Sequence, residues 1–328
     1  MTELKALRIA YGETLSELGS RMPNIVALDA DLAHATATYL FGEKFRNRFF
    51  NMGIAEQNMM GVAAGLALSG FIPFASTFAL FGAGRAFEQV RNSICYSKLN
   101  VKIAVTHPGL TVGEDGGSHQ SIEDISLMRT LPNMTVIVPC DAVETKKAVL
   151  AAAQWEGPVY LRIARPPAPV FIREDDPFVI GKANVLLDGA DISILATGLM
   201  VYRALQAAEL LKQAGIRAAV VNVHTIKPLD REVVIKMAQK TGRVITVEEH
   251  SVIGGLGSAV AEVLSENIPV QLKRIGIADQ FGQSGTPDGL LDHYGLSTAN
   301  IVKTAQEMVR KVKVDGSILF GSDYSQQL

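Results

Sequence analysis

The sequence predicts an α/β protein with two parallel-sheet domains. Short apolar runs bounded by turn residues alternate with longer segments of helical spacing, which is typical of a parallel sheet covered by helices on both faces. The chain has 328 residues, for which two domains are the usual expectation. A proline-rich, charged stretch at residues 164–178, ARPPAPVFIREDDPF, separates two such alternating sets. We therefore expect domains at residues 1–165 and 183–328, joined by a linker at 166–182.

In the first set, strands and helices follow one another regularly. Apolar residues at helical spacing predict an opening helix from Leu4 to Leu18, which ends before Gly19. The remaining elements expected in this set are a strand in NIVALDADL (24–32), a strand in RFFNMG (48–53), a helix from Ile54 to Leu68, a strand in FIPFAST (71–77), a helix from Gly82 to Tyr96, a strand in VKIAVTH (101–107), a helix from Ile122 to Arg129, a strand in MTVIVP (134–139), a helix from Ala142 to Gln154 and a strand in PVYLRIA (158–164).

The second set repeats the alternation. Its expected elements are a strand in DISILATG (191–198), a helix from Leu199 to Gln213, a strand in IRAAVVNVHT (216–225), a strand in GRVITVEEH (242–250), a helix in GGLGSAVAEVL (254–264), a strand in VQLKRIGIAD (270–279) and a helix from Thr298 to Val312. The tail after Lys313 is weakly patterned, and we expect it to be mobile.

Composition excludes several functional classes. The net charge is −2 with acids and bases interspersed, so no basic surface for nucleic acid is expected. Cys95 and Cys140 are too few for a disulfide framework or a zinc site, which fits a reducing cytoplasm. The uncharged run 61–84 is broken by Gly70 and Pro73, so we expect a buried helix and strand rather than a membrane span. The charged N-terminal segment does not resemble a signal peptide.

Three features of the first set indicate a binding site. Glu56 opens a long run without ionised side chains, and we expect a buried carboxyl in apolar surroundings there; a helix N-terminus is the alternative reading. Phe78 and Phe81 follow the next strand, and the glycine-rich loop HPGLTVGEDGGSHQ spans residues 107–120. Because ligands of parallel sheets lie beyond the carboxyl ends of strands, these features are expected to converge.

The sequence gives only weak signals for a metal site or a dinucleotide site. His107, Asp115 and His119 lack the spacing that fixes a metal geometry, so no metal site is predicted on this chain. The motif at residues 254–257, GGLG, follows a strand and opens a helix but lacks the G-x-G-x-x-G spacing of dinucleotide sites. We expect helix capping and close packing there. His224 and His250 follow strands and are expected to have structural roles.

The motifs around Glu56 resemble those of transketolases, which use thiamine diphosphate. GIAEQ resembles the segment of the catalytic glutamate, and STFALF is similar to the segment whose two aromatics flank the aminopyrimidine ring. DADLAHAT resembles a segment near the cofactor. The resemblance thus implies a pyrimidine-binding domain followed by a transketolase C-terminal-like domain, with cofactor contacts from Glu56, Phe78, Phe81, Asp31 and Leu32.

The same resemblance implies the sugar-binding residues. THPGLTVGEDGGSHQSIEDI closely matches a transketolase loop in which two histidines and an aspartate face the sugar, here His107, His119 and Asp115. Both histidines are also implied as catalytic proton carriers. GPVYLRIARP ends in Arg165, where the family binds the substrate phosphate; a linker arginine tied to Glu174 or Asp175 is the alternative. An arginine–serine pair that contacts phosphate in the family is not recognisable at residues 8–12.

One transketolase motif is absent. The family binds the cofactor diphosphate through Mg²⁺ held by a Gly-Asp-Gly motif, which this chain does not contain. The chain therefore resembles the C-terminal subunit of a split transketolase, which transfers a two-carbon ketol unit between sugar phosphates of the pentose phosphate type. We expect a separate diphosphate-binding subunit that supplies the Mg²⁺ ligands, in an α2β2 assembly. The alternatives are a part of a 1-deoxyxylulose 5-phosphate synthase, a 2-oxo-acid dehydrogenase β subunit, or a non-catalytic partner with this fold.

Overall fold

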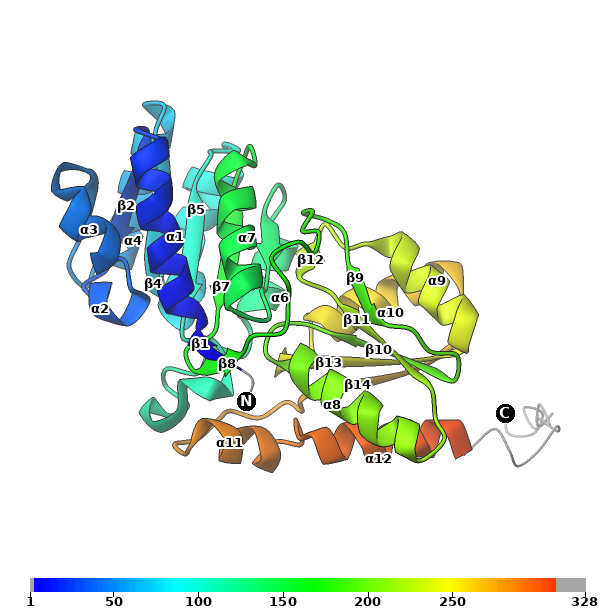
Figure 1. The fold of residues 1–328 in the computed structure, drawn as a ribbon. Coiled ribbons are helices and arrows are strands. Elements are labelled where there is room, and N and C mark those ends of the chain that lie inside the picture. The colour runs from blue at the N-terminus through cyan, green and yellow to red at the C-terminus, as the bar shows by residue number, and fades with distance from the viewer. Residues whose placement is uncertain (1–2, 311–328) are drawn as a thin grey trace, which may run out of the picture.

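The structure is a computed structural model that describes residues 3–310 and contains two main β-sheets side by side (Figure 1). Six strands of the larger sheet are parallel, and the strand at one edge is antiparallel. In spatial order this sheet contains β12 (Thr225–Lys227), β6 (Thr135–Ile137), β7 (Val159–Ile163), β5 (Lys102–Thr106), β4 (Ile72–Phe78), β2 (Ile25–Asp29) and β3 (Phe49–Asn51).

The smaller sheet has four parallel strands and an antiparallel edge strand. In spatial order it contains β14 (Gln271–Ile277), β13 (Arg243–Ser251), β10 (Ile192–Ala196), β11 (Ala218–Asn222) and β9 (Asn184–Leu187). The predicted class, α/β with two largely parallel sheets, is therefore confirmed.

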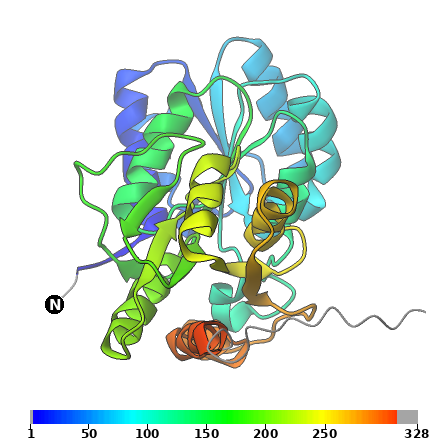
Figure 2. The ribbon, with the colours of Figure 1, turned by 90° about the vertical axis from the view of Figure 1, so that its right-hand side faces the viewer.

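Helices cover both faces of the larger sheet (Figure 2). The helices α1 (Leu7–Arg21) and α7 (Ala142–Gln154) pack on one face, and α4 (Glu56–Leu68) and α6 (Asp124–Thr130) pack on the other. The inner strands β2, β4, β5 and β7 are buried along their whole length, as expected of a sheet covered on both sides. Three short helices complete this part: α2 (Ala33–Thr36), α3 (Tyr39–Lys44) and α5 (Phe87–Gln89).

The smaller sheet is covered in the same way. The helices α8 (Met200–Gln213) and α12 (Thr298–Arg310) pack on one face, and α9 (Arg231–Thr241) and α10 (Leu256–Asn267) pack on the other. The short helix α11 (Pro287–His293) lies against a 3-10 turn of the larger-sheet half of the chain. Figure 1 shows α11 and α12 running beneath the two sheets.

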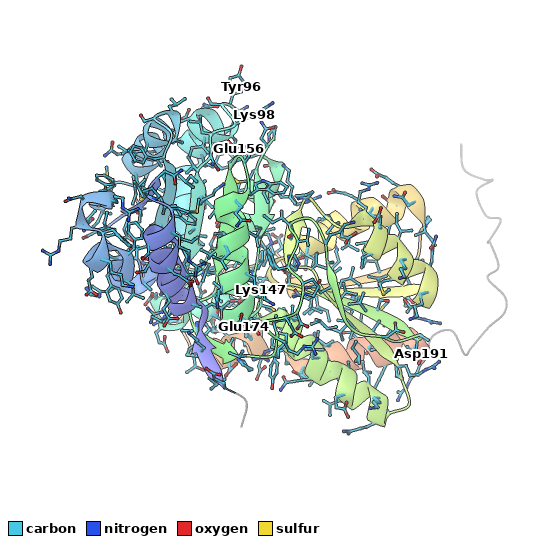
Figure 3. The ribbon with its side chains drawn as sticks, turned by 45° about the horizontal axis from the view of Figure 1, so that its top comes forward. Tyr96, Lys98, Lys147, Glu156, Glu174 and Asp191 are labelled. Atoms are coloured by element: carbon cyan, nitrogen blue, oxygen red, sulfur yellow. The ribbon has the colours of Figure 1, made fainter. Side chains whose placement is uncertain are left out.

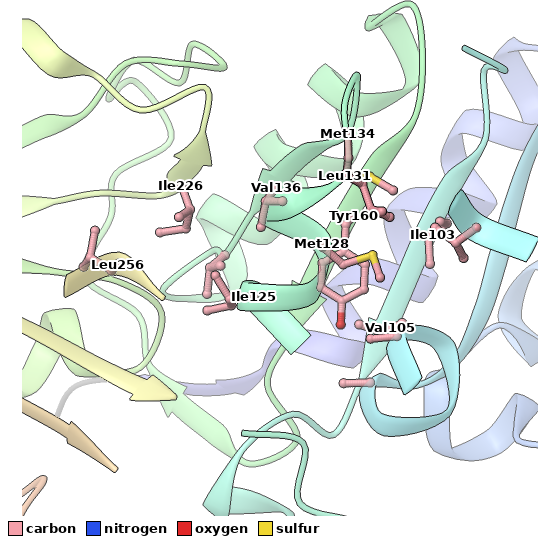
Figure 4. Close-up of a cluster of buried hydrophobic side chains, with 14 of the residues drawn as sticks. Ile103, Val105, Ile125, Met128, Leu131, Met134, Val136, Tyr160, Ile226 and Leu256 are labelled. Atoms are coloured by element: carbon pink, nitrogen blue, oxygen red, sulfur yellow. The ribbon is translucent and has the colours of Figure 1, made fainter. Parts of the chain in front are cut away.

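One apolar core extends across both halves of the chain. Figure 4 shows Ile125, Met128 and Tyr160 of the first half in the same buried cluster as Ile226 and Leu256 of the second. A buried ion pair lies at this boundary. In it, the Arg162 side chain donates to both carboxylate oxygens of Asp124, at 2.8 and 3.2 Å. The two halves therefore share a continuous interface.

The structure differs from the sequence prediction at several elements. The opening helix begins only at Leu7, because Leu4–Ala6 forms strand β1, which pairs with β8 (Pro167–Pro169). The helix predicted from Gly82 to Tyr96 is instead two π-helical stretches around α5, Phe81–Arg85 and Val90–Cys95. The prediction also missed α2, α3, α9, α11, β8, β9 and β12. Strands β1 and β12 depend on pairing partners far away in the sequence, β8 and β6.

The segment predicted as a linker is held against the first half of the chain. The Asp141 carboxylate accepts hydrogen bonds from the backbone N–H groups of Phe171 and Ile172. Lys147, labelled in Figure 3, donates to the carbonyls of Arg173 and Asp176 at 2.5 and 2.6 Å. The division into residues 1–165, 166–182 and 183–328 stays a prediction.

Two further predictions concern the limits of the chain and its surroundings. The tail after Lys313, together with the last two residues of the helix predicted to reach Val312, lies outside the described residues. Among residues 3–310, no helix has both the length and the apolar character needed to cross a membrane.

His224 and His250, in the second half of the chain, are structural, as expected from their positions. His224 is fully buried, and its ring stacks on Phe178 with a centroid distance of 4.2 Å. His250 is also fully buried, and its Nε2 accepts a hydrogen bond from the Ser126 N–H. Burial lowers the pKa of each ring to about 4, so both histidines are neutral in the folded chain at neutral pH.

Replacing His224 by phenylalanine should reduce the loss of stability on acidification. The folded-state pKa of about 4 lies below the unfolded value of about 6.5, so the unfolded chain binds more protons and stability falls as the pH drops below 6.5. Urea unfolding at about pH 7.5 and about pH 5 should show that the wild type loses ~2 kcal/mol more than His224→Phe, whose ring still faces Phe178. Equal losses would contradict a neutral His224.

Candidate active site

The predicted site residues gather at one edge of the larger sheet. Each follows the carboxyl end of a strand, where parallel sheets form their ligand sites. The positions are Asp31 and Leu32 after β2, Glu56 after β3, Phe78 and Phe81 at the end of β4, His107 with its loop after β5, and Arg165 after β7.

Aromatic and imidazole rings form the centre of the cluster. The rings of Phe78 and Phe81 are nearly parallel, with centroids 5.8 Å apart. The His107 ring stacks on Phe78 at 4.0 Å, and the His119 ring meets the edge of Phe81 at 5.6 Å. Four residues predicted from two separate segments are thus in contact.

Glu56 is the first residue of α4, and only 2% of its surface is exposed. Its surroundings are not wholly apolar, which corrects the expectation from the uncharged run. Arg85 Nη1 lies 2.9 Å from both carboxylate oxygens, and the guanidinium lies 4.3 Å from the Phe81 ring centre. Phe81 and Arg85 begin and end a π-helical stretch, Phe81–Arg85, which places their side chains on the same side of the backbone.

Arg85 is a site residue that the sequence prediction missed. The available signal was its position as the first ionised residue after the uncharged run, four residues after Phe81. About half of its side chain is exposed, so the guanidinium lies at the edge of the cluster while the Glu56 carboxylate lies inside.

His107 is almost fully buried and has a left-handed backbone with φ of 58°. Its Nδ1 shares a hydrogen bond of 2.8 Å with the Thr106 hydroxyl. Burial, with smaller effects from the positive charges of Arg165 and Arg8, lowers the pKa of His107 to about 3. The ring is therefore a neutral hydrogen-bonding group at physiological pH.

Arg8 is a second site residue that the sequence analysis did not identify. It extends from α1, and its Nη1 donates to the carbonyls of His34 and Ala35 at 3.2 Å each. Its charge acts on His107 together with that of Arg165. Two cations, from opposite ends of the first half of the sequence, therefore disfavour protonation of the buried imidazole.

Arg165 is tied to the glycine-rich loop rather than to the linker. Its Nη1 donates to the Val112 carbonyl and lies 3.3 Å from a Glu114 carboxylate oxygen. The alternative partners, Glu174 and Asp175, pair with other residues, so a linker ion pair for Arg165 is wrong.

The loop also carries Asp115 and His119. Asp115 ends the 3-10 turn Leu110–Asp115 and is exposed. Within residues 3–310 it makes no hydrogen bond or ion pair with the other predicted site residues. His119 is half-buried, and its Nδ1 lies 3.0 Å from the Ser118 hydroxyl.

Asp31 and Leu32 lie on the side of the cluster formed by β2 and β3. Asp31 is exposed, has a φ of 64°, and accepts a hydrogen bond of 3.1 Å from Asn51. The buried Asp29 carboxylate holds this turn through the Leu32 N–H and the hydroxyls of Thr36 and Thr38.

Neither a metal site nor a dinucleotide site is evident in the described residues. Among residues 3–310, no group of three or more His, Cys, Asp or Glu side chains is arranged to hold a metal ion. At the GGLG motif, the backbone N–H groups of Leu256 and Gly257 donate to the buried Glu248 carboxylate at 2.6 and 2.7 Å. A side chain at Gly255 would collide with that carboxylate, so the glycines serve close packing.

Comparison with known proteins identifies both halves of the chain. Residues 4–169 match the model of the transketolase pyrimidine-binding domain, and residues 181–301 match that of the transketolase C-terminal domain. A Methanocaldococcus jannaschii protein described as a putative transketolase C-terminal section is 51% identical, over 94% of this chain and 97% of that protein. A Clostridium sp. protein described as the 6-deoxy-6-sulfo-D-fructose transketolase subunit SqwH is 47% identical, over 93% of this chain and 95% of that protein.

A solved structure agrees with these matches. It is described as a split-gene transketolase, an inactive β4 tetramer, and is 55% identical with a TM-score of 0.87. The similarity covers 93% of this chain and 98% of that chain. The resemblance predicted from the motifs, to the C-terminal subunit of a split transketolase, is confirmed.

Replacing Arg8 or Arg165 by alanine should raise the pKa of His107. Both guanidinium charges disfavour the protonated ring, although burial is the larger cause and should keep the pKa well below 6. We expect a rise of ~0.5 for each variant, since both charges are partly screened by solvent. Imidazole ¹⁵N NMR titration measures it, with the exposed Arg91→Ala as the control. Unchanged titration in both variants would remove the arginines from the surroundings of His107.

Proposed function

The chain belongs to the transketolase family, and we propose that it is the pyrimidine-binding subunit of a split, thiamine diphosphate-dependent enzyme. This enzyme would transfer a two-carbon ketol unit from a ketose to an aldose. The observation that carries the proposal is the buried Glu56 carboxylate beside the nearly parallel rings of Phe78 and Phe81.

The residues present fit the aminopyrimidine half of the cofactor. Thiamine diphosphate supplies the nucleophilic carbon of the reaction when it is bound. Phe78 and Phe81 offer apolar faces for ring stacking, with Asp31 and Leu32 at the edge of the site. Glu56 would hydrogen-bond a pyrimidine nitrogen, and for this its carboxyl must first give up its contact with Arg85.

The other half of the cluster suits a polar, anionic sugar. His107 is neutral, so its ring can donate or accept a hydrogen bond with a hydroxyl, and His119 meets the edge of the neighbouring Phe81 ring. The guanidinium groups of Arg165 and Arg8 would bind the anionic end of the sugar. Asp115 would orient a sugar hydroxyl from the exposed end of the loop.

The substrates we propose are ketose and aldose phosphates, such as xylulose 5-phosphate and ribose 5-phosphate. Arg165 would contact the phosphate, since paired guanidinium donors match phosphate oxygens. The Clostridium relative is named for a sulfonated ketose, and a sulfonate is also an oxyanion that arginine side chains can bind. An anionic terminal group is thus the common requirement of this proposal.

The diphosphate half of the cofactor would be bound elsewhere. A diphosphate carries several negative charges and is usually held through Mg²⁺ with oxygen ligands. The described cluster around Glu56 contains one buried carboxylate, already paired with Arg85, and stacked rings. We propose that a separate subunit provides the Mg²⁺ ligands and that two copies of each subunit form a closed α2β2 assembly.

The chain alone should be inactive, and a diphosphate-binding partner subunit should restore activity. Ketol transfer from xylulose 5-phosphate to ribose 5-phosphate should appear when both chains, Mg²⁺ and thiamine diphosphate are mixed. Titration of one chain with the other should saturate near equal amounts. The control is each chain alone under the same conditions. Turnover by this chain alone at ordinary enzyme rates would contradict the split-enzyme proposal.

In the reconstituted enzyme, Glu56→Gln should lower turnover by roughly 100- to 10,000-fold, which is the rate factor that general acid–base catalysis usually contributes. The amide keeps the size of the side chain but cannot exchange a proton as a carboxyl does. Circular dichroism and assembly with the partner should be unchanged. Glu88→Gln is the matched control, because Glu88 is an exposed glutamate whose side-chain hydrogen bonds within residues 3–310 are to Gln89 and Asn92. Near-normal turnover in Glu56→Gln would exclude Glu56 from the mechanism.

A further inference from the structure

The loop of residues 107–121, which we call the substrate loop, follows β5 and is contacted from the first half by Arg165, which donates to the Val112 carbonyl. Its backbone adopts positive φ angles at His107, Gly109, Gly113 and Gly116, so it follows a path that regular structure does not stabilise. Its two ends are joined by a hydrogen bond of 2.8 Å from the Gly109 N–H to the Ser121 carbonyl. The middle of the loop needs other contacts to keep one conformation.

The first of these contacts comes from the second half of the chain. Glu249 lies near the end of β13, and its Oε1 accepts a hydrogen bond of 2.6 Å from the Thr111 N–H. The glutamate is 4% exposed, and Thr111 is also buried. A side chain at Gly109 would lie only 2.5 Å from the same carboxylate oxygen, so the loop is closely fitted to this group.

A second contact lies farther along the loop. Gln120 Nε2 donates to the carbonyls of Leu110 and Gly113 at 3.3 Å and to the Gln283 carbonyl at 3.0 Å. A Cβ atom at Gly282 would lie 1.8 Å from Gln120 Oε1. The segment 282–285, which precedes α11, therefore closes over the loop without space for side chains at this point.

Glu249 is held in place through both its side chain and its backbone by residues of the first half. Burial raises the pKa of its carboxyl, although the nearby Arg162 and the Thr111 N–H favour the ionised form. Arg162 also donates a hydrogen bond of 3.0 Å to the Glu249 carbonyl. Placing a carboxyl group in a buried site is costly. The Glu249 carboxyl lies in such a site and accepts its side-chain hydrogen bond from the loop backbone, which indicates that its role is to hold the loop.

We propose that the second half of the chain fixes the conformation of the substrate loop, with Glu249 as the positioning residue. Glu249 touches neither substrate nor cofactor in this proposal. It acts through the Thr111 backbone and so sets the positions of His107 and His119 at the two ends of the loop. The second half thereby has a role in the active site in addition to any role in subunit assembly.

We call this fixing of the substrate loop by the second half the clamp. Hydrogen–deuterium exchange of the purified chain tests the clamp without reference to activity. In Glu249→Ala, the amides of residues 109–120 should exchange about tenfold faster, as expected when a buried hydrogen bond is lost. Glu249→Gln should be close to wild type, because its amide oxygen can still accept from Thr111. Unchanged exchange in a folded Glu249→Ala chain would overturn the proposal.

Glu248→Ala is the matched control. Glu248 is the neighbouring buried glutamate on β13, but its carboxylate accepts from the N-terminus of α10 instead of from the loop. Its loss should destabilise the chain while leaving exchange in the loop unchanged. If Glu249→Ala does not fold, Gly282→Ala provides the test, since it displaces Gln120 without removing a buried carboxyl group. Wild-type exchange in folded Gly282→Ala would then reject the clamp.

A kinetic experiment extends the test to the active site and rests on the proposed function. In the enzyme reconstituted with the diphosphate-binding subunit, Glu249→Ala should raise the KM for xylulose 5-phosphate about tenfold with a smaller change in kcat. Glu249→Gln should restore the wild-type KM, and Glu248→Ala should not change it. Faster loop exchange with an unchanged KM would support the clamp and count against sugar binding by the loop, so the two proposals can fail separately.

Discussion

The buried ion pair between Arg162 and Asp124 joins the parts of the molecule on which the site depends. Arg162 lies on β7, Asp124 begins α6, and the same guanidinium donates to the carbonyls of Ser121 and Glu249. Burial alone would raise the pKa of Asp124, but Arg162 holds it below its usual value. Such pairs add little net stability, whereas loss of one partner leaves a costly buried charge. The pair therefore fixes α6 against β7, and the bond from the same guanidinium to the Glu249 carbonyl favours one relative position of the two halves.

The cluster around Glu56 is electrostatically balanced within the chain. Each of the three arginines near the rings has an internal partner: Arg8 bonds to carbonyls, Arg85 to Glu56, and Arg165 to the loop. Ligands would have to compete with these contacts, and the free energy lost when these internal contacts break reduces the net binding energy. In return, the side chains are held near their working positions. The proposed site thus combines pre-arranged rings with cations that would exchange their internal partners for the ligand.

Sequence alone predicted the strand ends and, through the resemblance, the residues that meet there. Local patterns suffice for this, because the alternation of elements sets the sheet and the sheet brings strand ends together. The prediction failed where distant segments decide the structure. Arg85 reaches Glu56 only through a π-helical stretch, and β1 exists only because Pro167–Pro169 lies beside it. Similarly, nothing near Glu249 in the sequence indicates that its carboxylate holds the Thr111 backbone.

The edge strand β12 has a consequence for how this polypeptide can be divided. It belongs by sequence to the second half, yet it pairs with β6 and completes the larger sheet. A chain cut in the segment 166–182 would leave β6 as an open, apolar sheet edge, the kind of surface on which strands of other molecules add and aggregates begin. The two halves are consequently one folding unit, because separating them would expose an apolar sheet edge.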